Sequence, residues 1–223
     1  MPQLLQDVIL NRHSSRSFLP TPIPRHVLTH ALSLAAHAPS NSNIQPWRLF
    51  IASGPARDRL AASLLAAASS VIEKGEMPRM QRLPDDFQQH RWQLGSSLWG
   101  ELMGVPRHDK KARAAAELLN YNFFGAPTVI IVAIDRRLGS GDVLGVGMYL
   151  QLLLLALDEE GIGACCQVSL LGYEDVIRKE LGIDNGLDIL CGVSVGYPDL
   201  EAKLNTFRAT RDLYETTTRF FDE

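Results

Sequence analysis

The chain has 223 residues, of which 46% are hydrophobic and 21% are charged, which is enough to bury one sizeable core or two small ones. Its formal net charge of −3 excludes the overall basic surface that is typical of a nucleic-acid binder. The three cysteines are odd in number and show no metal-type spacing, which favours a reducing compartment. We therefore expect a soluble, cytoplasmic protein.

Neither the N-terminal segment nor the longest apolar run has the pattern of a membrane segment. The first 15 residues include Asp7 and lack the long apolar core of a signal peptide. The apolar run Val143–Leu157 is interrupted by Gln151 and is shorter than the ~20 residues that a membrane span needs. We interpret this run as a buried helix and expect no membrane partner.

Helix-like and strand-like patterns alternate along the chain. Besides the apolar run, the sequence predicts helices at Gln3–Asn11, Arg25–His37, Pro55–Lys74, Lys110–Tyr121 and Tyr173–Leu181. It predicts strands at Trp47–Ala52, Thr128–Val132, Ala164–Val168 and Leu190–Val195. The segment Met77–Trp99 contains two prolines and scattered arginines, which predicts an irregular excursion, and the polar tail from Glu201 shows no convincing period. The pattern indicates a single α+β or α/β domain over residues 1–223.

Side-chain amides and hydroxyls concentrate between two prolines in residues 39–47, Pro-Ser-Asn-Ser-Asn-Ile-Gln-Pro-Trp, which we call the amide-rich loop. These groups offer donors and acceptors that suit the edge of a flat heterocycle. The prolines restrict the backbone and can hold the side chains in place. A polar connection between a helix and a strand is the alternative interpretation.

Two clusters of arginines suggest a phosphate site. In Arg12–Phe18, which we call the basic segment, Arg12, Ser14 and Arg16 are spaced by two, so an extended backbone directs them to one side. Two guanidinium groups and a hydroxyl on one face can clamp a phosphate. Arg208 and Arg211 form a second pair near the end of the chain. Taken singly, either cluster also fits a solvated surface patch.

Together the basic segment and the amide-rich loop resemble the signature of the FMN-dependent nitroreductase family, in particular its nitrobenzoate-reductase-like branch. The resemblance continues, in the family's order, through segments that span nearly the whole chain. These are Phe123–Pro127, Gly161–Gln167, Gly196–Asp199 and Asn205–Arg211. It implies an α+β, nitroreductase-like three-layer sandwich, with a central mixed β-sheet flanked by helices, in an intertwined homodimer.

The resemblance also implies which residues hold FMN at two sites shared between the subunits. The phosphate would be held by Arg12, His13, Ser14 and Arg16, joined by Arg208 and Arg211. The ring would be lined from the other subunit by Pro39, Ser40, Asn41 and Asn43, with Gln45 nearby. The segment passing the N5 edge would be Cys166, Gln167, Val168 and Ser169. The two late arginines are three apart, which leaves open which of them reaches the phosphate.

The implied function is an NADH- or NADPH-dependent oxidoreductase that reduces nitroaromatics, quinones or related small-molecule acceptors by a ping-pong mechanism. The cofactor carries the hydride, so we assign no catalytic acid, base or nucleophile, and no metal site. A flavin-sequestering or dehalogenating protein of the same fold is an alternative. A further alternative is a Rossmann-type NAD or S-adenosylmethionine binder, because Gly139–Leu144 follows a strand and imitates a dinucleotide-binding turn.

The irregular excursion at about 77–99 is expected to cover the active site and to set acceptor choice. Its aromatic side chains could stack on a planar acceptor, and Arg79, Arg82 or Arg91 could pair with an acceptor's carboxylate or reach the flavin pyrimidine edge. A surface excursion that only buries the edge of the core is the alternative.

Overall fold

The computed structural model describes residues 4–74 and 83–222. Its four strands are β1 (Trp47–Ser53), β2 (Thr128–Asp135), β3 (Gly163–Gln167) and β4 (Leu187–Gly196). The α-helices are α1 (Leu5–Asn11), α2 (Arg25–Ala35), α3 (Pro55–Glu73), α4 (Asp85–Gly95), α5 (Lys110–Tyr121), α6 (Ser140–Glu159), α7 (Glu174–Leu181), α8 (Lys203–Thr206) and α9 (Tyr214–Thr217). The described chain also contains the 3₁₀ turns η1 (Asn41–Asn43), η3 (Phe123–Gly125) and η4 (Val168–Tyr173) and the π-helix η2 (Ser96–Leu102). Every strand and every long helix predicted from the sequence is present; α5 has the predicted ends, and the ends of the other elements differ from the prediction by at most a few residues.

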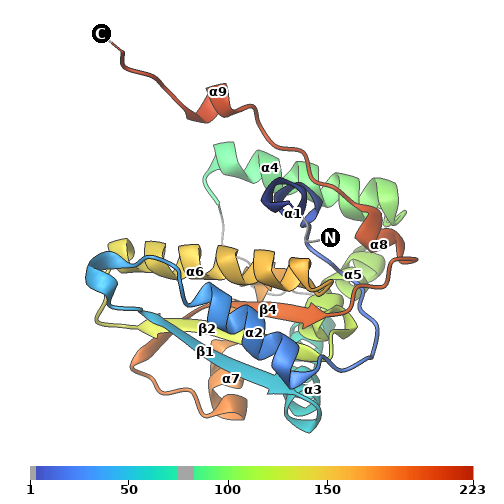
Figure 1. The fold of residues 1–223 in the computed structure, drawn as a ribbon. Coiled ribbons are helices and arrows are strands. Elements are labelled where there is room, and N and C mark those ends of the chain that lie inside the picture. The colour runs from blue at the N-terminus through green and yellow to red at the C-terminus, as the bar shows by residue number, and fades with distance from the viewer. Residues whose placement is uncertain (1–3, 75–82, 223) are drawn as a thin grey trace.

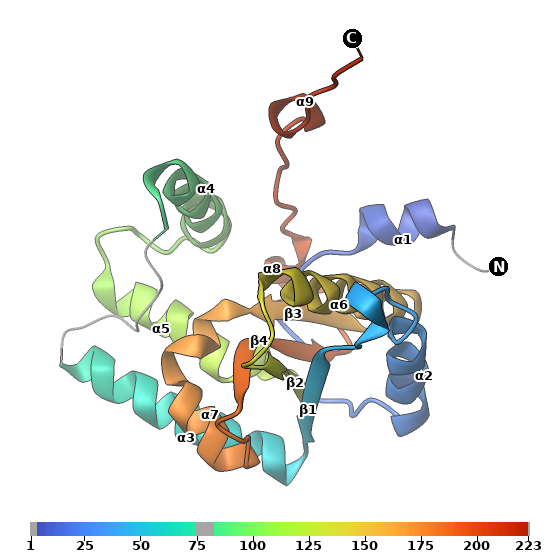
Figure 2. The ribbon, with the colours of Figure 1, turned by 90° about the vertical axis from the view of Figure 1, so that its left-hand side faces the viewer.

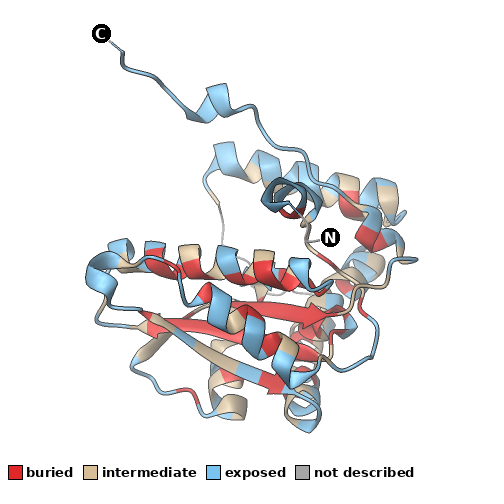
Figure 3. Ribbon diagram, viewed as in Figure 1, coloured by how far each residue is buried: buried red, intermediate tan, exposed pale blue. Residues whose placement is uncertain are grey.

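Helices cover both faces of one sheet, which gives the expected three layers (Figure 1). The central strand β2 alternates between the two cores even though nearly all of it is buried. Val129 and Ile131 pack with α3, α5 and α7, whereas Ile130, Val132 and Ile134 pack with α2 and α6. Figure 3 shows this buried centre and the exposed C-terminal arm that follows α8. Period-two alternation therefore directs side chains into two separate apolar layers.

The strand order is β1-β2-β4-β3, and each neighbouring pair is antiparallel. This corrects the expectation of a mixed sheet for the described residues. The reason is that β4 lies between β2 and β3, so the two strands joined through α6 run in the same direction without being neighbours. Within the described residues, parallel pairing occurs at the isolated bridge between Ser14 and Ala164.

Among the described helices, α6 alone has the length and apolar composition of a membrane span. It lies against the sheet and α2, where its buried side chains include Tyr149, Leu153 and Leu157. Its apolar character is therefore explained by core packing, as the sequence predicts.

The described part of the segment expected to be irregular, residues 83–99, is largely helical. Residues 85–95 form α4, and residues 96–102 continue it as the π-helix η2. Pro84 precedes the helix and Asp85 and Asp86 occupy its first turn, which are ordinary helix-start signals that outweigh the scattered charges further on. Arg79 and Arg82, which the sequence analysis singled out, lie outside the described residues. Figure 2 shows α4 and α5 on the side of the molecule away from α2.

Candidate cofactor site

The basic segment lies along the edge strand β3. The backbone N–H of Ser15 donates to the Ala164 carbonyl at 3.0 Å. Ser15 is buried, and a Cβ added to Gly163 would lie 2.5 Å from its Oγ, so this close approach requires glycine. With Ser15 directed inward, the extended backbone turns Ser14 and Arg16 to the opposite face, as their spacing predicts.

Asn205 on α8 fixes the basic segment to the C-terminal part of the chain. Its buried side chain donates to the carbonyls of Ser17 at 2.7 Å and Asp199 at 2.8 Å, and it accepts from the Arg16 backbone N–H at 2.6 Å. Its own carbonyl accepts from Arg208 Nη1 at 2.7 Å. The sequence analysis missed this role, although Asn205 opens the late segment that resembles the family.

Three basic side chains act on Asp158 near the C-terminal end of α6. Burial raises the pKa of this carboxyl, and His13, Arg12 and Arg208 partly oppose the rise. The His13 ring donates through Nδ1–H to the Asn11 carbonyl at 3.0 Å. Its Nε2 is buried and has no hydrogen-bond partner among the described residues. As an imidazolium, His13 would add an Nε2–H donor to the two guanidinium groups and the serine hydroxyl, and such a donor set fits a phosphate.

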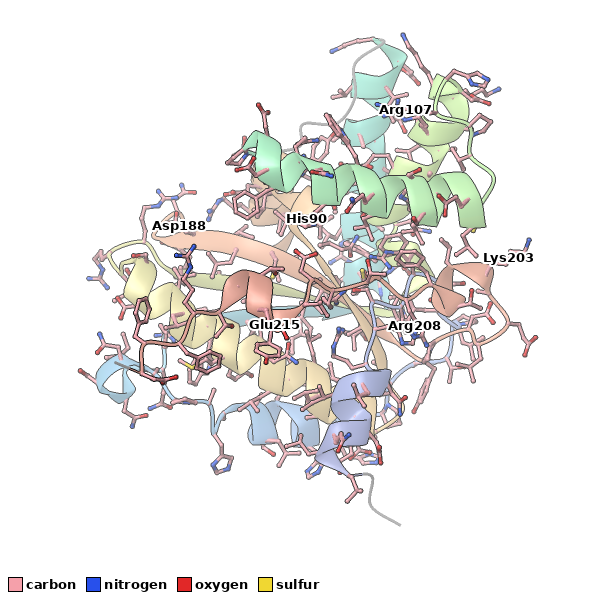
Figure 4. The ribbon with its side chains drawn as sticks, turned by 90° about the horizontal axis from the view of Figure 1, so that it is seen from above. His90, Arg107, Asp188, Lys203, Arg208 and Glu215 are labelled. Carbon is pink, nitrogen blue, oxygen red and sulfur yellow. The ribbon has the colours of Figure 1, made fainter. Side chains whose placement is uncertain are left out.

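The two late arginines differ in their surroundings. Arg208 bonds to Asn205 and lies where the C-terminal arm leaves α8 (Figure 4). Arg211 Nη1 donates at 3.0 Å to the carbonyls of Ala209 and Thr210, within its own exposed segment. The sequence left open whether Arg208 or Arg211 reaches the phosphate. In the structure, Arg208 is the one linked to the basic segment, through Asn205.

Along Cys166–Ser169 the side chains alternate between solvent and core. Val168 is exposed, whereas Gln167 is 3% exposed and directed inward. Gln167 Nε2 donates to the Asn120 carbonyl at 2.8 Å, and its Oε1 accepts from Ser194. Asn120 Oδ1 also accepts from Ser169 Oγ at 3.2 Å. The Gln167 amide is thus used inside the protein, and this residue can reach a ligand only through its backbone.

The cysteines in this region stay protonated near neutral pH. Burial raises the pKa of Cys191 to about 11, and desolvation raises that of Cys166 to about 12 although its side chain is partly open to solvent. Burial also raises the pKa of Cys165. Because the thiolate is the reactive form of cysteine, none of these thiols is suited to act as a nucleophile.

The amide-rich loop is held in an unusual backbone conformation. Ser42, Asn43 and Gln45 have φ values of 48°, 56° and 49°, in the left-handed region that side chains rarely adopt. The Gln45 N–H donates to Ser40 Oγ at 3.0 Å, which closes the loop on itself. Asn41, Asn43 and Gln45 are all exposed. Conformational strain combined with exposed amides is typical of a segment shaped to meet something outside its own chain.

This loop is anchored at the N-terminal end of α6. Asn41 Nδ2 donates to Asp142 Oδ1 at 3.3 Å, and Ser40 packs on Gly145, where a Cβ would lie 3.2 Å from the Ser40 Cβ. Pro39 is exposed beside them. Asp158, next to the basic segment, lies sixteen residues further along the same helix, or about 24 Å at 1.5 Å per residue. The structure therefore does not bring the two predicted halves together within one chain.

A cavity of about 610 Å³ lies between α4, η2 and α5. Its described lining includes Arg16 and Ser169, so it borders the predicted cofactor residues, and it includes Glu117 and Asn120 from α5. Burial raises the pKa of Glu117, while a hydrogen bond from Tyr121 lowers it. The sequence analysis missed Glu117 and Asn120, whose three-residue spacing on one helix face was the available signal.

The turn that imitates a dinucleotide-binding fingerprint does not serve as one. Asp142 Oδ2 accepts from the Gly139 backbone N–H at 3.0 Å, so a carboxylate occupies the start of α6 where a pyrophosphate would have to bind. The preceding strand β2 has antiparallel neighbours on both sides. A Rossmann unit needs parallel neighbours, so this alternative is wrong.

Comparison with known proteins gives one consistent result. The sequence model of the nitroreductase family matches residues 9–197 of this chain. A curated 4-nitrobenzoate reductase from Pseudomonas putida is 34% identical over 217 residues, which cover 96% of this chain and 93% of that protein.

Solved structures agree with the sequence comparison. The FMN-dependent nitroreductase NfnB from Mycobacterium smegmatis, solved in complex with NADPH, superimposes with a TM-score of 0.88 at 33% identity and covers 97% of each chain. The FMN and NADPH-dependent NfnB from Sphigopyxis sp. strain HMH gives a TM-score of 0.91 at 27% identity, over 99% of this chain and 100% of the other.

Proposed function

The chain belongs to the nitroreductase family, and from this premise we propose that it is an FMN-dependent NAD(P)H oxidoreductase that reduces nitroaromatics, quinones or related acceptors. The relatives compared above are named for the reduction of nitroaromatics and for dependence on FMN and NADPH. The observation that carries the proposal is the phosphate-type donor set of the basic segment, in which the buried His13 Nε2 has no partner within the described part of the chain. When bound, FMN supplies the hydride chemistry.

The residues of this chain bind and orient. We assign the cofactor phosphate to Arg12, His13, Ser14 and Arg16 of the basic segment, joined by Arg208. Arg12, His13 and Arg208 all act on Asp158 near the C-terminal end of α6, which supports this assignment. Arg16 also lines the cavity. The backbone of Cys166–Ser169 borders the ring at the sheet edge, where an edge strand has unpaired N–H and C=O groups. Donor and acceptor take turns in the adjoining cavity, which gives ping-pong kinetics.

We further propose that the active form is a cytoplasmic homodimer with two shared sites. The amide-rich loop and the basic segment lie about 24 Å apart along α6, so a loop that lines the ring must come from a second copy. Large apolar side chains exposed on α1 and on the C-terminal arm would be covered by that copy. These are Leu4, Leu5, Ile9, Leu10, Leu213, Tyr214, Phe220 and Phe221.

The absorbance spectrum of the purified protein tests the proposed activity. We expect a flavin spectrum that is bleached by NADPH or NADH without oxygen and restored by a nitroaromatic. A bound flavin that neither nucleotide bleaches would instead indicate a sequestering protein. Restoration by a halogenated aromatic with release of halide, but not by nitroaromatics, would indicate the dehalogenating alternative.

Sedimentation across a dilution series tests the shared site. We expect flavin to remain with the dimer and to be released as the dimer dissociates, because each chain supplies half of the contacts. A monomer that retains a full complement of flavin would contradict the shared site without contradicting the reaction.

A further inference from the structure

Two different segments of the chain form the walls of the cavity between α4, η2 and α5. One wall comes from α4 and η2, with Arg91, Trp92 and Trp99, and the other from the residues leading into and through α5, with Arg107 and Arg113. Figure 4 shows Arg107 on the side of the molecule that carries α4, far from Asp188. Arg16 and Ser169 line the same cavity, so its inner end adjoins the proposed cofactor residues.

The charge of the described lining is strongly positive. Four arginines line the cavity, and Glu117 is the one acidic side chain among the described lining residues. Burial disfavours the ionised form of this carboxyl, and Arg91 and Arg113 act against that effect. No described residue forms an ion pair with Arg107 or Arg113; Arg113 Nη1 reaches the Arg107 carbonyl at 3.5 Å. An excess of guanidinium groups around a partly dry cavity favours an anionic ligand.

The aromatic side chains that line the cavity indicate that the ligand is planar. Trp92 is 61% exposed, which is unusual for the largest apolar side chain, and it lines the cavity seven residues before Trp99. Phe124 is buried at the same cavity. Flat side chains of this kind gain most by stacking on a planar ring.

We propose that the acceptor of this enzyme is an aromatic carboxylate, whose ring lies against the tryptophans of α4 and η2 and whose carboxylate is bound by Arg107 and Arg113. The inference rests on the proposed function and adds the substrate class and two specificity-determining residues. A guanidinium group binds a carboxylate through two parallel hydrogen bonds, so a neutral analogue of the same shape forfeits most of this contact. The phosphate of a nicotinamide dinucleotide is the other anion that could reach the cavity, and the test separates the two.

Calorimetric titration of the purified flavin-loaded protein with benzoate and with benzamide tests the proposal, because neither compound is reduced. We expect benzoate to bind about a hundredfold more tightly than benzamide, about tenfold for the charge-assisted pair with each of the two arginines. Arg107→Gln and Arg113→Gln should each lower this preference about tenfold. Lys111→Gln removes a charge from an exposed position of α5 outside the described lining, and it should leave the preference unchanged.

Each other outcome has a definite meaning. Equal binding of benzoate and benzamide by a protein whose flavin is bleached by NADPH would overturn the inference and leave the proposed function standing. A protein without flavin that still prefers benzoate would overturn the proposed function, while the carboxylate site would stand. If the arginine variants weaken binding of NADP⁺ but keep the benzoate preference, the cavity recognises the nucleotide phosphate and the inference is wrong.

Discussion

The basic segment and the amide-rich loop lie near opposite ends of α6 and are held in opposite ways. The basic segment is fastened inside its own chain, by Ser15 against β3 and by the three side-chain bonds of Asn205. The amide-rich loop is closed mainly on itself, in a left-handed backbone conformation, and presents its amides to solvent. One half of the proposed site is therefore held in place by the fold of its own chain, whereas the other would be completed by a second copy in the proposed dimer.

The two aspartates near the ends of α6, Asp142 and Asp158, also differ in how well the fold accommodates their charge. Asp142 at the N-terminal end accepts from the Gly139 N–H and from Asn41, and its charge is favoured there by the helix dipole. Asp158 near the C-terminal end is disfavoured by burial and by the dipole, and the basic groups around it only partly compensate. The two ends of α6 therefore place their carboxylates in opposite electrostatic surroundings.

Removing the fastening of the basic segment should have the largest effect. Asn205→Ala would leave the carbonyls of Ser17 and Asp199 and the N–H of Arg16 without their buried partner. We expect a loss of about 3 kcal/mol in the free energy of unfolding, measured by urea denaturation, together with loss of flavin. Thr206→Ala on the exposed side of α8 is the matched control. A stable Asn205→Ala variant with full flavin would show that the segment is held in some other way.

Removing a phosphate donor should weaken cofactor binding while the fold persists. Arg12→Ala or Arg16→Ala should each cost about 1.5–3 kcal/mol of FMN binding, because a phosphate loses a charge-assisted donor. Bound flavin per chain after dialysis measures this. Arg208→Ala should behave like them, and Arg211→Ala should retain more flavin. Stoichiometric flavin in both Arg12→Ala and Arg16→Ala would contradict the phosphate assignment.

In the amide-rich loop, Asn43→Gly tests whether the side chain serves a ligand. Glycine accepts the φ of 56° without strain, so unfolding stability should change by less than about 1 kcal/mol. Flavin affinity should nevertheless fall several-fold, which equilibrium dialysis of the dimer would detect. If flavin affinity is unchanged while stability drops, the asparagine serves the fold and the contrast with the basic segment disappears.

The smallest effect is expected from Asp158→Asn, and it depends on pH. Because the folded-state pKa is raised above the ordinary value of 3.8, ionisation destabilises the fold as pH rises through the folded-state pKa. The variant should therefore be slightly more stable than the natural protein at pH 7, and the difference should vanish below about pH 4. Thermal unfolding across this range measures it. A variant that is less stable at pH 7 would mean that the carboxylate is needed by its basic neighbours.

Much of the fold could be predicted because its signals are local. The run Thr128–Val132 is β-branched and apolar, and helix α5 begins and ends at the two residues that the sequence indicated. The helix α4 was missed because prolines and scattered charges were read as irregularity, although Pro84 followed by two aspartates is a helix start. The strand order could not be inferred, since it depends on β4 inserting between β2 and β3.

The candidate site divides in the same way. The residues of the basic segment and the amide-rich loop form local motifs, and the resemblance to the family identified them. Asn205 bonds to residues 188 and 189 positions away, and Gln167 to Asn120 across 47 positions. Such long-range pairings leave no period or motif in the sequence, so only the folded chain reveals them. The cavity likewise gathers arginines from separate elements.

The length of α6 has a consequence for symmetry. If the loop of each chain meets the basic segment of the other, both sites lie across the same two-fold axis, and the two α6 helices set their separation. Inserting or deleting one helical turn in α6 would shift the contact between loop and basic segment by about 5.4 Å at both sites. The two shifts would be related by the two-fold axis, so neither could compensate for the other. This helix is therefore a segment in which changes of length are far less tolerable than changes of side chain.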